Sequence, residues 1–347
     1  MTFSKTLLEW YALHKRELPW RNTRDPYYIW LSEIILQQTR VQQGLSYYLK
    51  FIHSFPTIFD LANAEEDTIL KLWQGLGYYS RARNLHHSAK DIVSNRNGKF
   101  PDNYHEILSL KGVGPYTAAA IASFAFELPY SVLDGNVIRV LSRFFGVEVP
   151  FDITSGKKQF QELAQELIDK ENASEYNQAI MEFGAIQCTP KRVKCTNCPL
   201  SDECVAFNNN EVERLPVRSK RIILKKRFIH YLIIDQDSKV LFGKRKEGIW
   251  NGLYEFPFLE FPHNIDSSSV LHSDKWIDFF NGLDYEVEFI SEEFIHKLSH
   301  QHIYVRFWLV KMRGLTLANH QLVNKSELNN YPVSALIDKF LEQIKFI

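Results

Sequence analysis

The chain has 347 residues, of which 45% are hydrophobic and 14% are aromatic. This composition excludes an intrinsically disordered chain, and the length is sufficient for two compact domains. Because 41 Lys and Arg residues balance 41 Asp and Glu residues, overall charge does not attract the chain to nucleic acid, and any such binding must come from clustered basic residues.

No segment of the sequence predicts a signal peptide or a membrane span. The first residues lack a continuous apolar core, and no apolar run approaches the roughly 20 residues needed to cross a bilayer. We therefore expect a soluble protein of the cytoplasm, associated with the nucleoid if the source is bacterial.

Residues 1–207 have the pattern of an all-α domain. Apolar residues recur three and four positions apart, and Glu65–Leu72 and Gln159–Asp169 have the pattern of amphipathic helices. Pro26, Pro56 and Pro101 each stand near a predicted helix start, where the missing amide hydrogen does no harm.

Residues 208–227 form a predicted basic linker. The segment begins with Asn208-Asn209-Asn210, and after Glu213 its charged residues are all basic. A charge run of this kind is either a solvated face or, beside a DNA-binding domain, a segment that lies along phosphates.

Residues 228–347 predict a smaller α+β domain. The period changes to two, with β-branched or aromatic runs at Phe228–Ile234, Lys239–Phe242 and Ile303–Val310 that are separated by turn residues.

The cysteines predict a metal centre. All of them fall in one short window, as Cys188, Cys195, Cys198 and Cys204, whereas disulfides would be spread more widely along a chain of this size. The spacing leaves zinc and an iron-sulfur cluster open, because either can be held by four thiolates. In both cases every ligand comes from the protein, so we expect a structural role.

Two segments are candidates for contacts with DNA phosphates. The residues after the first cysteine include Lys191, Arg192 and Lys194, which a rigid loop would present to a phosphate backbone. The hairpin Gly112-Val113-Gly114 precedes a predicted helix at Thr117–Phe126 and can expose backbone amides to an anion. A plain structural turn is the alternative for the hairpin, and the cysteine loop favours the phosphate role.

Glu33 is a candidate for an acid that keeps its proton in an apolar setting, and Asp134 is a second acid, in a sequence that suits a helix start. On a helix that starts near Pro26, Glu33 shares an apolar stripe with Ile29 and Leu36, which would raise its pKa and keep it protonated. Asp134 stands in Leu-Asp-Gly-Asn-Val. The alternatives are that Glu33 is an ordinary surface acid and that Asp134 is a helix N-cap.

Several motifs together carry a resemblance to a known family. They are Leu18-Pro19-Trp20-Arg21, Trp30-Leu31-Ser32-Glu33, Leu36-Gln37-Gln38-Thr39, Gly75-Leu76-Gly77-Tyr78-Tyr79 and Leu133-Asp134-Gly135-Asn136-Val137, beside the cysteine spacing. Residues 1–207 resemble the helix-hairpin-helix DNA glycosylase superfamily, in its iron-sulfur branch of endonuclease III-like enzymes and MutY-type adenine glycosylases. The resemblance implies one 4Fe-4S cluster per chain on the four cysteines.

The resemblance also implies a chemistry. Removing a base from its sugar needs an acid for the leaving base and a negative charge near the cationic sugar, so a pair of carboxylates suits the task. By resemblance, Glu33 protonates adenine at N7 and later assists water, while Asp134 stabilises or transiently bonds the sugar cation. Tyr116 and Asn136 support the pair by hydrogen bonding.

The same resemblance argues against a lyase. The lyase members of the family place a lysine nucleophile where this chain has Tyr116, and Lys111 lies on the other side of the hairpin.

The base must be extruded from the duplex, and side chains must fill the gap. Gln38 and Tyr78 are similar to the gap-filling and stacking residues of the family. The family's adenine pocket maps onto Arg16, Trp20, Arg21, Leu36 and Gln178, although Trp20 also suits a plain core position.

Residues 228–347 resemble the Nudix-like domain of adenine glycosylases, with the best match at 250–257. No Arg-Glu-x-x-Glu-Glu box follows, so we expect recognition of the lesion and no Mg²⁺-dependent hydrolysis. The family reads 8-oxoguanine with a Phe-Ser-His loop, and the nearest match is Leu298-Ser299-His300, where Leu replaces the aromatic residue. Ser299 and His300 are therefore candidates for lesion contacts, with a surface loop as the alternative.

We therefore predict a monomeric, monofunctional adenine DNA glycosylase of base excision repair that acts on duplex DNA with adenine opposite 8-oxoguanine or guanine. The alternatives are an endonuclease III-like glycosylase/lyase for oxidised pyrimidines and a non-catalytic module that binds damaged DNA. A module that only binds has no need of both Glu33 and Asp134.

Overall fold

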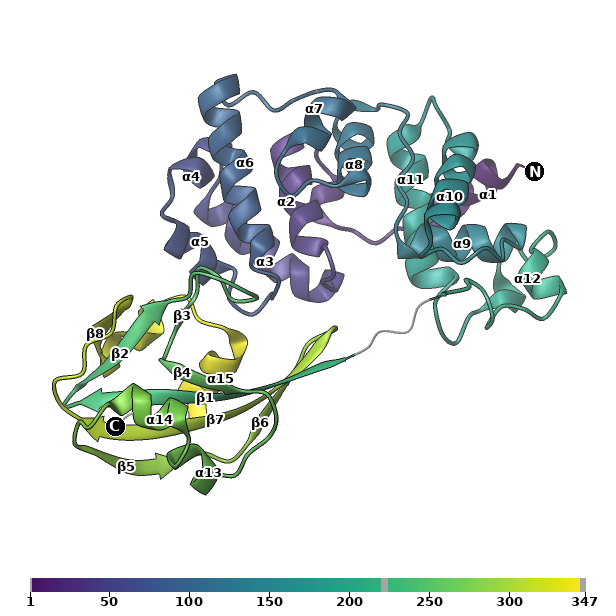
Figure 1. The fold of residues 1–347 in the computed structure, drawn as a ribbon. Coiled ribbons are helices and arrows are strands. Elements are labelled where there is room, and N and C mark those ends of the chain that lie inside the picture. Colours follow the sequence, from purple (N-terminus) through teal and green to yellow (C-terminus); the bar gives the residue numbers. More distant parts are fainter. Residues whose placement is uncertain (1, 220–223, 344–347) are drawn as a thin grey trace. The chain divides into compact units, whose positions relative to one another are not determined.

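The computed structural model describes residues 2–219 and 224–343. The chain divides into two compact units (Figure 1), one made of Met1–Asn63 and Asn84–Lys220 and the other of Ala64–Arg83 and Arg221–Ile347. In the described part of the chain, no helix is long and apolar enough to cross a membrane.

The first unit is helical, as predicted. Its described elements are α1 (Phe3–His14), η1 (Pro19–Arg21), α2 (Pro26–Leu36), α3 (Val41–Ser54), α4 (Ile58–Asn63), α6 (Ser80–Arg96, which begins in the second unit), α7 (Tyr104–Ser109), α8 (Pro115–Phe126), α9 (Gly135–Phe145), α10 (Thr154–Leu167), α11 (Ala173–Glu182), the π-helical turn η2 (Phe183–Gln187), η3 (Cys195–Asn197) and α12 (Val205–Asn208).

Local sequence signals determine where the two helices that carry the candidate carboxylates begin and end. Asp25 caps α2 by accepting a hydrogen bond of 2.8 Å from the Tyr27 backbone N–H, and Pro26 occupies the first turn, where no amide hydrogen is needed. Asp134 caps α9 in the same way, and α9 ends at Gly146, whose φ of 66° is left-handed.

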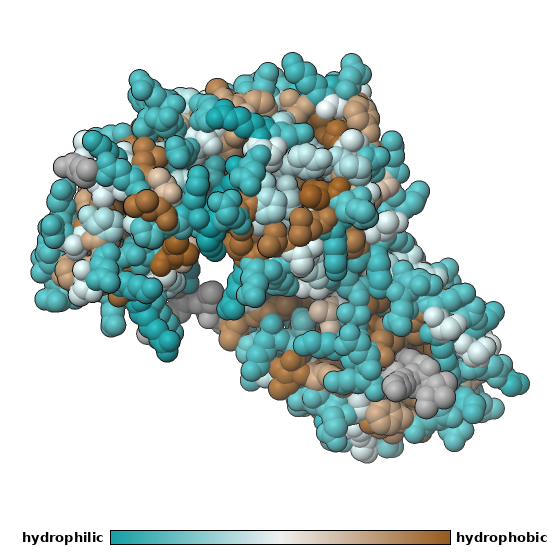
Figure 2. Space-filling model, turned by 180° about the vertical axis from the view of Figure 1, so that it is seen from behind, coloured by the Kyte–Doolittle hydropathy of each residue, from teal (hydrophilic) through white to brown (hydrophobic). Residues whose placement is uncertain are grey.

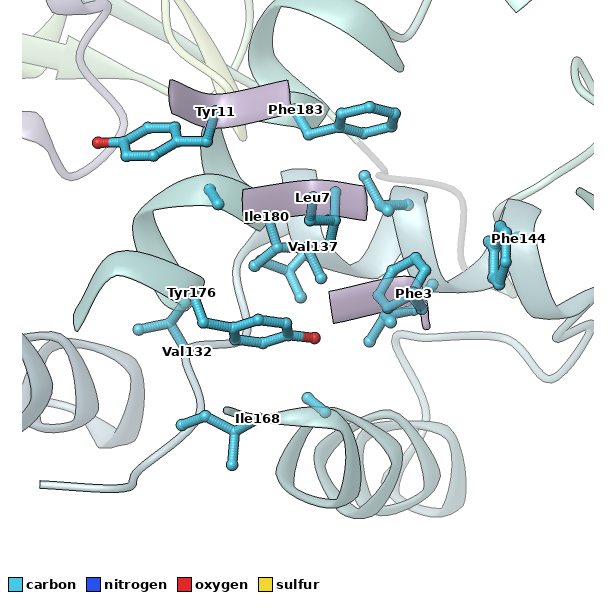
Figure 3. Packing of buried hydrophobic residues seen from close by; sticks show 14 of the residues in the cluster. Phe3, Leu7, Tyr11, Val132, Val137, Phe144, Ile168, Tyr176, Ile180 and Phe183 are labelled. Carbon is cyan, nitrogen blue, oxygen red and sulfur yellow. The ribbon is translucent and has the colours of Figure 1, made fainter. Parts of the chain in front are cut away.

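The core of the first unit packs α1 against α9 and α11. Leu7 of α1, Val137 of α9 and Ile180 of α11 are buried and pack together (Figure 3). Tyr176 and Phe183 belong to the same cluster. This packing holds the start of α9 against the end of α11, and candidate site residues lie at both places.

The second unit is built on a mixed sheet. Its described elements are α5 (Glu66–Leu72), β1 (Lys225–Gln236), β2 (Lys239–Lys244), β3 (Tyr254–Glu255), β4 (Phe258–Phe261), α13 (Ser267–Leu271), α14 (Asp274–Phe280), β5 (Tyr285–Ile290), β6 (Phe294–Lys297), β7 (Gln301–Met312), β8 (His320–Asn324), the 3-10 helix η4 (Lys325–Asn330) and α15 (Ala335–Gln343). The strand order is β3-β2-β1-β7-β5, with β4 on β1, β6 on β7 and β8 on β2.

The long strands β1 and β7 run parallel, in register from Lys225 opposite Gln301 to Asp235 opposite Lys311. Trp308 of β7 packs on Trp276 of α14 on one face, and Phe307 stacks on Phe340 of α15 at 3.7 Å between ring centroids on the other. Because neighbouring strand residues point to opposite faces, each face of the sheet has its own apolar layer.

The segment predicted as a linker, 208–227, has packed elements at both ends. Leu215 is buried, and the Phe151 backbone N–H donates to the Val217 carbonyl at 3.2 Å. Strand β1 begins at Lys225, before the predicted boundary at Phe228, because Lys225–Arg227 continue the ladder with β7. Residues 220–223 of the predicted linker lie outside the described residues. The division into 1–207, 208–227 and 228–347 stays a prediction.

The molecular surface seen in Figure 2 is mainly hydrophilic, with smaller hydrophobic areas. This is the ordinary condition of a folded chain whose large apolar side chains are mostly internal.

Candidate active site

One pocket of the first unit, of about 630 Å³, collects most of the predicted site residues. Side chains from α2, η1, the start of α8, the start of α9 and the end of α11 line it. The predicted residues among them are Arg16, Trp20, Arg21, Glu33, Leu36, Gln38, Gly114, Tyr116, Asp134, Asn136 and Gln178. The structure thus brings together residues that are up to 162 positions apart in the sequence.

Glu33 is a buried acid on α2, only 6% exposed, so it is not an ordinary surface residue. Burial raises the pKa of Glu33 to about 7, against an opposing hydrogen bond from the Tyr116 hydroxyl. Negatively charged Asp134 adds to the rise, and the Arg21 guanidinium lowers the pKa. Close to neutral pH, Glu33 can therefore hold a proton and give it up.

Asp134 is the N-cap of α9 and also faces the pocket. Its Oδ1 accepts hydrogen bonds from the backbone N–H groups of Asn136 and Val137, both at 2.8 Å. Its Oδ2 accepts a hydrogen bond from Asn136 Nδ2 at 2.7 Å. Burial raises the pKa of Asp134, and these three hydrogen bonds and the charge of Arg139 oppose that rise. The N-cap role and the pocket position therefore belong to the same residue.

Arg139 orients the Asn136 side chain. Arg139 Nη2 donates to Asn136 Oδ1 at 2.8 Å and to the Gly184 carbonyl at 2.6 Å, while Nε donates to the Cys188 carbonyl at 2.7 Å. Because Asn136 Oδ1 accepts this bond, its amide nitrogen is left to donate to Asp134.

Arg16 and Arg21 meet on a buried carboxylate. Arg16 donates to both oxygens of Glu182, from Nε at 2.7 Å and Nη2 at 2.6 Å, and its backbone N–H donates at 3.0 Å. Arg21 Nη2 donates to the same Glu182 at 2.8 Å. Burial by itself would raise the pKa of Glu182, but the hydrogen bonds from the two arginines lower it to about 2.

The other residues predicted for the base pocket lie on the same lining. Trp20 is partly exposed and packs edge-on against Tyr48, so it is not a plain core residue. Gln178 of α11 accepts a hydrogen bond from the Tyr11 hydroxyl at 3.1 Å. Leu36 ends α2 and contributes an apolar wall.

Gln38 and Tyr78, the predicted gap-filling residues, share an unusual backbone. Their φ angles are 54° and 47°, in the left-handed region that non-glycine residues seldom adopt, and both side chains are exposed. Gln38 follows α2 in the first unit, whereas Tyr78 belongs to the second unit. Such strained positions concentrate at functional sites.

The glycine hairpin leads directly into α8. Gly112 has a φ of 84°, and a Cβ there would lie 2.7 Å from the Asn84 Cβ, so only glycine fits without a shift. Val113 is buried and anchors the turn. Gly114 caps α8, and a Cβ there would meet nothing within 4 Å, so its backbone faces open space.

The four predicted metal-binding cysteines line one small hollow of about 30 Å³ as free thiols. Arg143 Nη1 donates to Cys188 Sγ at 3.4 Å and to the Thr189 carbonyl at 2.8 Å. Among the described residues, no group of three or more His, Cys, Asp or Glu side chains is arranged around a single metal-ion position. Lys191, Arg192 and Lys194 of this loop are exposed.

In the second unit, Ser299 and His300 are exposed in the turn that leads into β7. The Ser299 Oγ lies 2.9 Å from the Tyr78 hydroxyl, within the same unit. The structure thus brings a predicted lesion-contact residue beside a predicted stacking residue.

Comparison with known proteins gives two family matches. Residues 31–170 match the HhH-GPD superfamily of base excision DNA repair proteins, and residues 229–343 match the NUDIX domain. An adenine DNA glycosylase of Buchnera aphidicola subsp. Baizongia pistaciae is 35% identical over 354 residues, which covers 98% of this chain and 97% of the relative. The chain belongs to the adenine DNA glycosylase family.

Adenine DNA glycosylases of more distant sources are also similar. The protein of Arabidopsis thaliana is 34% identical, covering 89% of this chain and 57% of the relative. The protein of Homo sapiens is 41% identical, covering 61% of this chain and 41% of the relative.

Solved structures show the fold of the first unit. A thermostable thymine-DNA glycosylase is 32% identical, with a TM-score of 0.56 over 60% of this chain and 95% of that one. An endonuclease III in a non-covalent DNA complex shares the fold, with a TM-score of 0.52 at 21% identity over 60% of this chain and 99% of that one. Membership of the adenine DNA glycosylase family makes the chain a DNA glycosylase, a hydrolase of N-glycosyl bonds that acts in base excision repair.

In this adenine DNA glycosylase family member, sequence reasoning missed Glu182 and Arg139. Glu182 lies one helical turn after Gln178 on α11, and an acid next to the apolar residues Ile180, Met181 and Phe183 was the available signal. Arg139 likewise follows Asn136 by three positions, which places both on one side of α9. Their partners come from other elements, so the sequence did not reveal their role.

Proposed function

We propose that this chain hydrolyses the bond between adenine and deoxyribose where the adenine lies opposite 8-oxoguanine or guanine. The observation that supports this most directly is the pairing of two carboxyl groups on one pocket, with Glu33 buried and near neutral in its pKa and Asp134 held by hydrogen bonds. Two carboxyl groups on one pocket suit an acid and its anionic partner.

In the proposed mechanism, the adenine leaves the duplex and enters the pocket. The Glu33 carboxyl gives its proton to N7 of adenine, the bond between C1′ and N9 breaks with its electron pair leaving on the base, and the sugar becomes cationic. The carboxylate of Asp134, at the N-terminus of α9, stabilises that cation or bonds to it transiently. Water then adds at C1′ as Glu33 takes back a proton.

We propose that the reaction ends once the base has been released and water has added to the sugar, without a covalent adduct between a lysine and the DNA. Tyr116 occupies the position where the lyase members of the family have a lysine, and its hydroxyl donates a hydrogen bond to Glu33. In the described part of the chain, the residues that line the pocket include no lysine. Borohydride should therefore trap no protein–DNA adduct, and a trapped adduct would favour the glycosylase/lyase alternative.

The test of the acid is Glu33→Gln in single-turnover assays on duplexes with adenine opposite 8-oxoguanine. Because glutamine keeps the shape but has no proton to donate, we expect duplex binding to persist and base release to fall by at least about 100-fold. Glu106→Gln, at an exposed acid of the same unit, is the control. Normal release by the Glu33 variant would contradict the proposal, and tight binding without release by the unmodified protein would favour a binding module.

We further propose that Ser299 and His300 contact the base opposite adenine. Their exposure in the turn before β7 and the neighbouring Tyr78 support the proposal. Ser299→Ala and His300→Ala should reduce the preference for 8-oxoguanine over guanine and thymine, whereas Ser268→Ala, exposed in the same unit, should not. An unchanged order of preference in both variants would remove this role.

We propose that Cys188, Cys195, Cys198 and Cys204 hold one 4Fe-4S cluster. Four thiols on one hollow match the ligand set of such a cluster. When bound, the cluster cross-links the loop that carries Lys191, Arg192 and Lys194. Iron and acid-labile sulfide should be present in equal amounts and be lost in Cys198→Ala, and zinc without sulfide would contradict the assignment.

A further inference from the structure

Glu182 is a buried acid at the end of α11 that the proposed chemistry does not use. Its side chain is 1% exposed, and each of its oxygens accepts a hydrogen bond from Arg16. Arg21 shares the Oε2 atom, and Arg21 Nη1 also donates to the Arg16 carbonyl at 3.0 Å. One carboxylate therefore holds two guanidinium groups and one backbone amide.

The two arginines form part of a wall between two hollows. Arg16, Arg21 and Gln178 line the candidate active site, and the same three residues line a second, more polar hollow of about 280 Å³. Arg21 lies over the Tyr11 ring, 5.6 Å from its centroid, but its only carboxylate partner among the described residues is Glu182. Without that carboxylate, no anionic group among the described residues would fix the arginine pair in the wall.

The positive charges of Arg16 and Arg21 would oppose the proposed proton transfer. Two guanidinium groups oppose the transfer of a proton onto a base beside them, since like charges repel. Glu182 stays ionised throughout the neutral range because its arginine partners hold its pKa at about 2. The local charge of the group is thus reduced from two positive charges to one.

We propose that Glu182 is a positioning residue for base release. It fixes Arg16 and Arg21 in the pocket wall and reduces the positive charge that they present to Glu33. This inference rests on the proposed function. The charged and titratable groups that face Glu33 are Tyr116 from α8 and Asp134 at the start of α9, with Arg21 of η1 on the side of Glu182. Without the negative charge of Glu182, the positive charge of Arg21 beside Glu33 would be unbalanced. Both changes favour the ionised form of Glu33 and so lower its pKa.

The experiment is the pH dependence of adenine release under single-turnover conditions, with the full chain and a duplex that carries adenine opposite 8-oxoguanine. Glu182→Gln keeps the shape and removes the charge. Its rate should decline on the alkaline side about 0.5–1 pH unit earlier than that of the unmodified protein, so that at pH 8 the rate falls by a further factor of about 3–10. Glu182→Asp keeps the charge but shortens the reach, so it should lower the rate at all pH values with little movement of the midpoint.

The control is Glu127→Gln. Glu127 also accepts from an arginine, Arg24 at 2.8 Å, and from a backbone amide, that of Ser174 at 3.1 Å, but it does not line the candidate active site. It should leave the midpoint in place. Should Glu182→Gln fail to fold, Arg16→Gln tests the same charge balance in reverse, with an expected midpoint at or above that of the unmodified protein.

Two results would overturn the inference. One is a Glu182→Gln rate that falls by the same factor at every pH, which a purely structural residue would give, or that does not fall at all. The other is an Arg16→Gln midpoint that moves to lower pH. Failure of the unmodified protein to release adenine would instead reject the proposed function, so the two failures are distinguishable.

Discussion

At the scale of a single residue, Glu33 predicts how the activity depends on pH. Burial raises the pKa of its carboxyl to about 7, and the proposed acid acts in its protonated form. The protonated form predominates below that pKa and is lost above it, so the single-turnover rate should fall by about tenfold per pH unit well above pH 7. A rate–pH profile checks this, and a rate that rises from pH 7 to 9 would contradict the assignment.

Tyr116 should tune that profile in the opposite sense to Glu182. Its hydroxyl donates a hydrogen bond that stabilises the ionised form of Glu33 and so lowers the pKa. Tyr116→Phe removes the bond, and the alkaline midpoint should rise by about one pH unit while the plateau falls. Tyr28→Phe, which loses a bond to the Pro56 carbonyl away from the pocket, is the matched control. A midpoint that stays in place or falls in Tyr116→Phe would show that this bond does not act on Glu33.

At the scale of the element, Asp134 has two separable roles on α9. Its carboxylate caps two backbone amides, and asparagine caps a helix about as well as aspartate does. Asp134→Asn should therefore unfold with a free energy close to that of the unmodified protein while losing base release. Asp134→Ala should lose release and also about 1 kcal/mol of the free energy of unfolding. Denaturant titration and single-turnover assays separate the roles, and release by Asp134→Asn at the normal rate would leave Asp134 as a cap alone.

At the scale of the whole molecule, the charge distribution predicts how DNA binding responds to salt. The chain is neutral overall, so phosphate binding depends on local groups such as Lys191, Arg192 and Lys194. Replacing all three with alanine should flatten the plot of log affinity against log salt concentration by about 0.9 for each phosphate that these side chains neutralise. Replacing the exposed lysines Lys5, Lys157 and Lys170 is the control, and an equal effect of both triple variants would argue against a local phosphate site.

Signals that act over a few residues were predictable. Pro26 near the start of α2, the apolar stripe that buries Glu33 and the capping position of Asp134 all follow from short-range spacing. The alternating run Phe228–Ile234 likewise lies inside β1. These features depend on backbone geometry and on the side of a helix or strand that a residue occupies, which neighbouring residues decide.

The sequence by itself thus determined the helical first part, the mixed second part, the grouped cysteines and, through its motifs, the family. Tertiary structure decided the rest. The parallel pairing of β1 with β7, the packing of Ala64–Arg83 in the second unit and the meeting of Glu182 with Arg16 and Arg21 join residues that are far apart in the chain. No local pattern specifies such partners, because a buried charge is stable only where the fold brings an opposite charge to it.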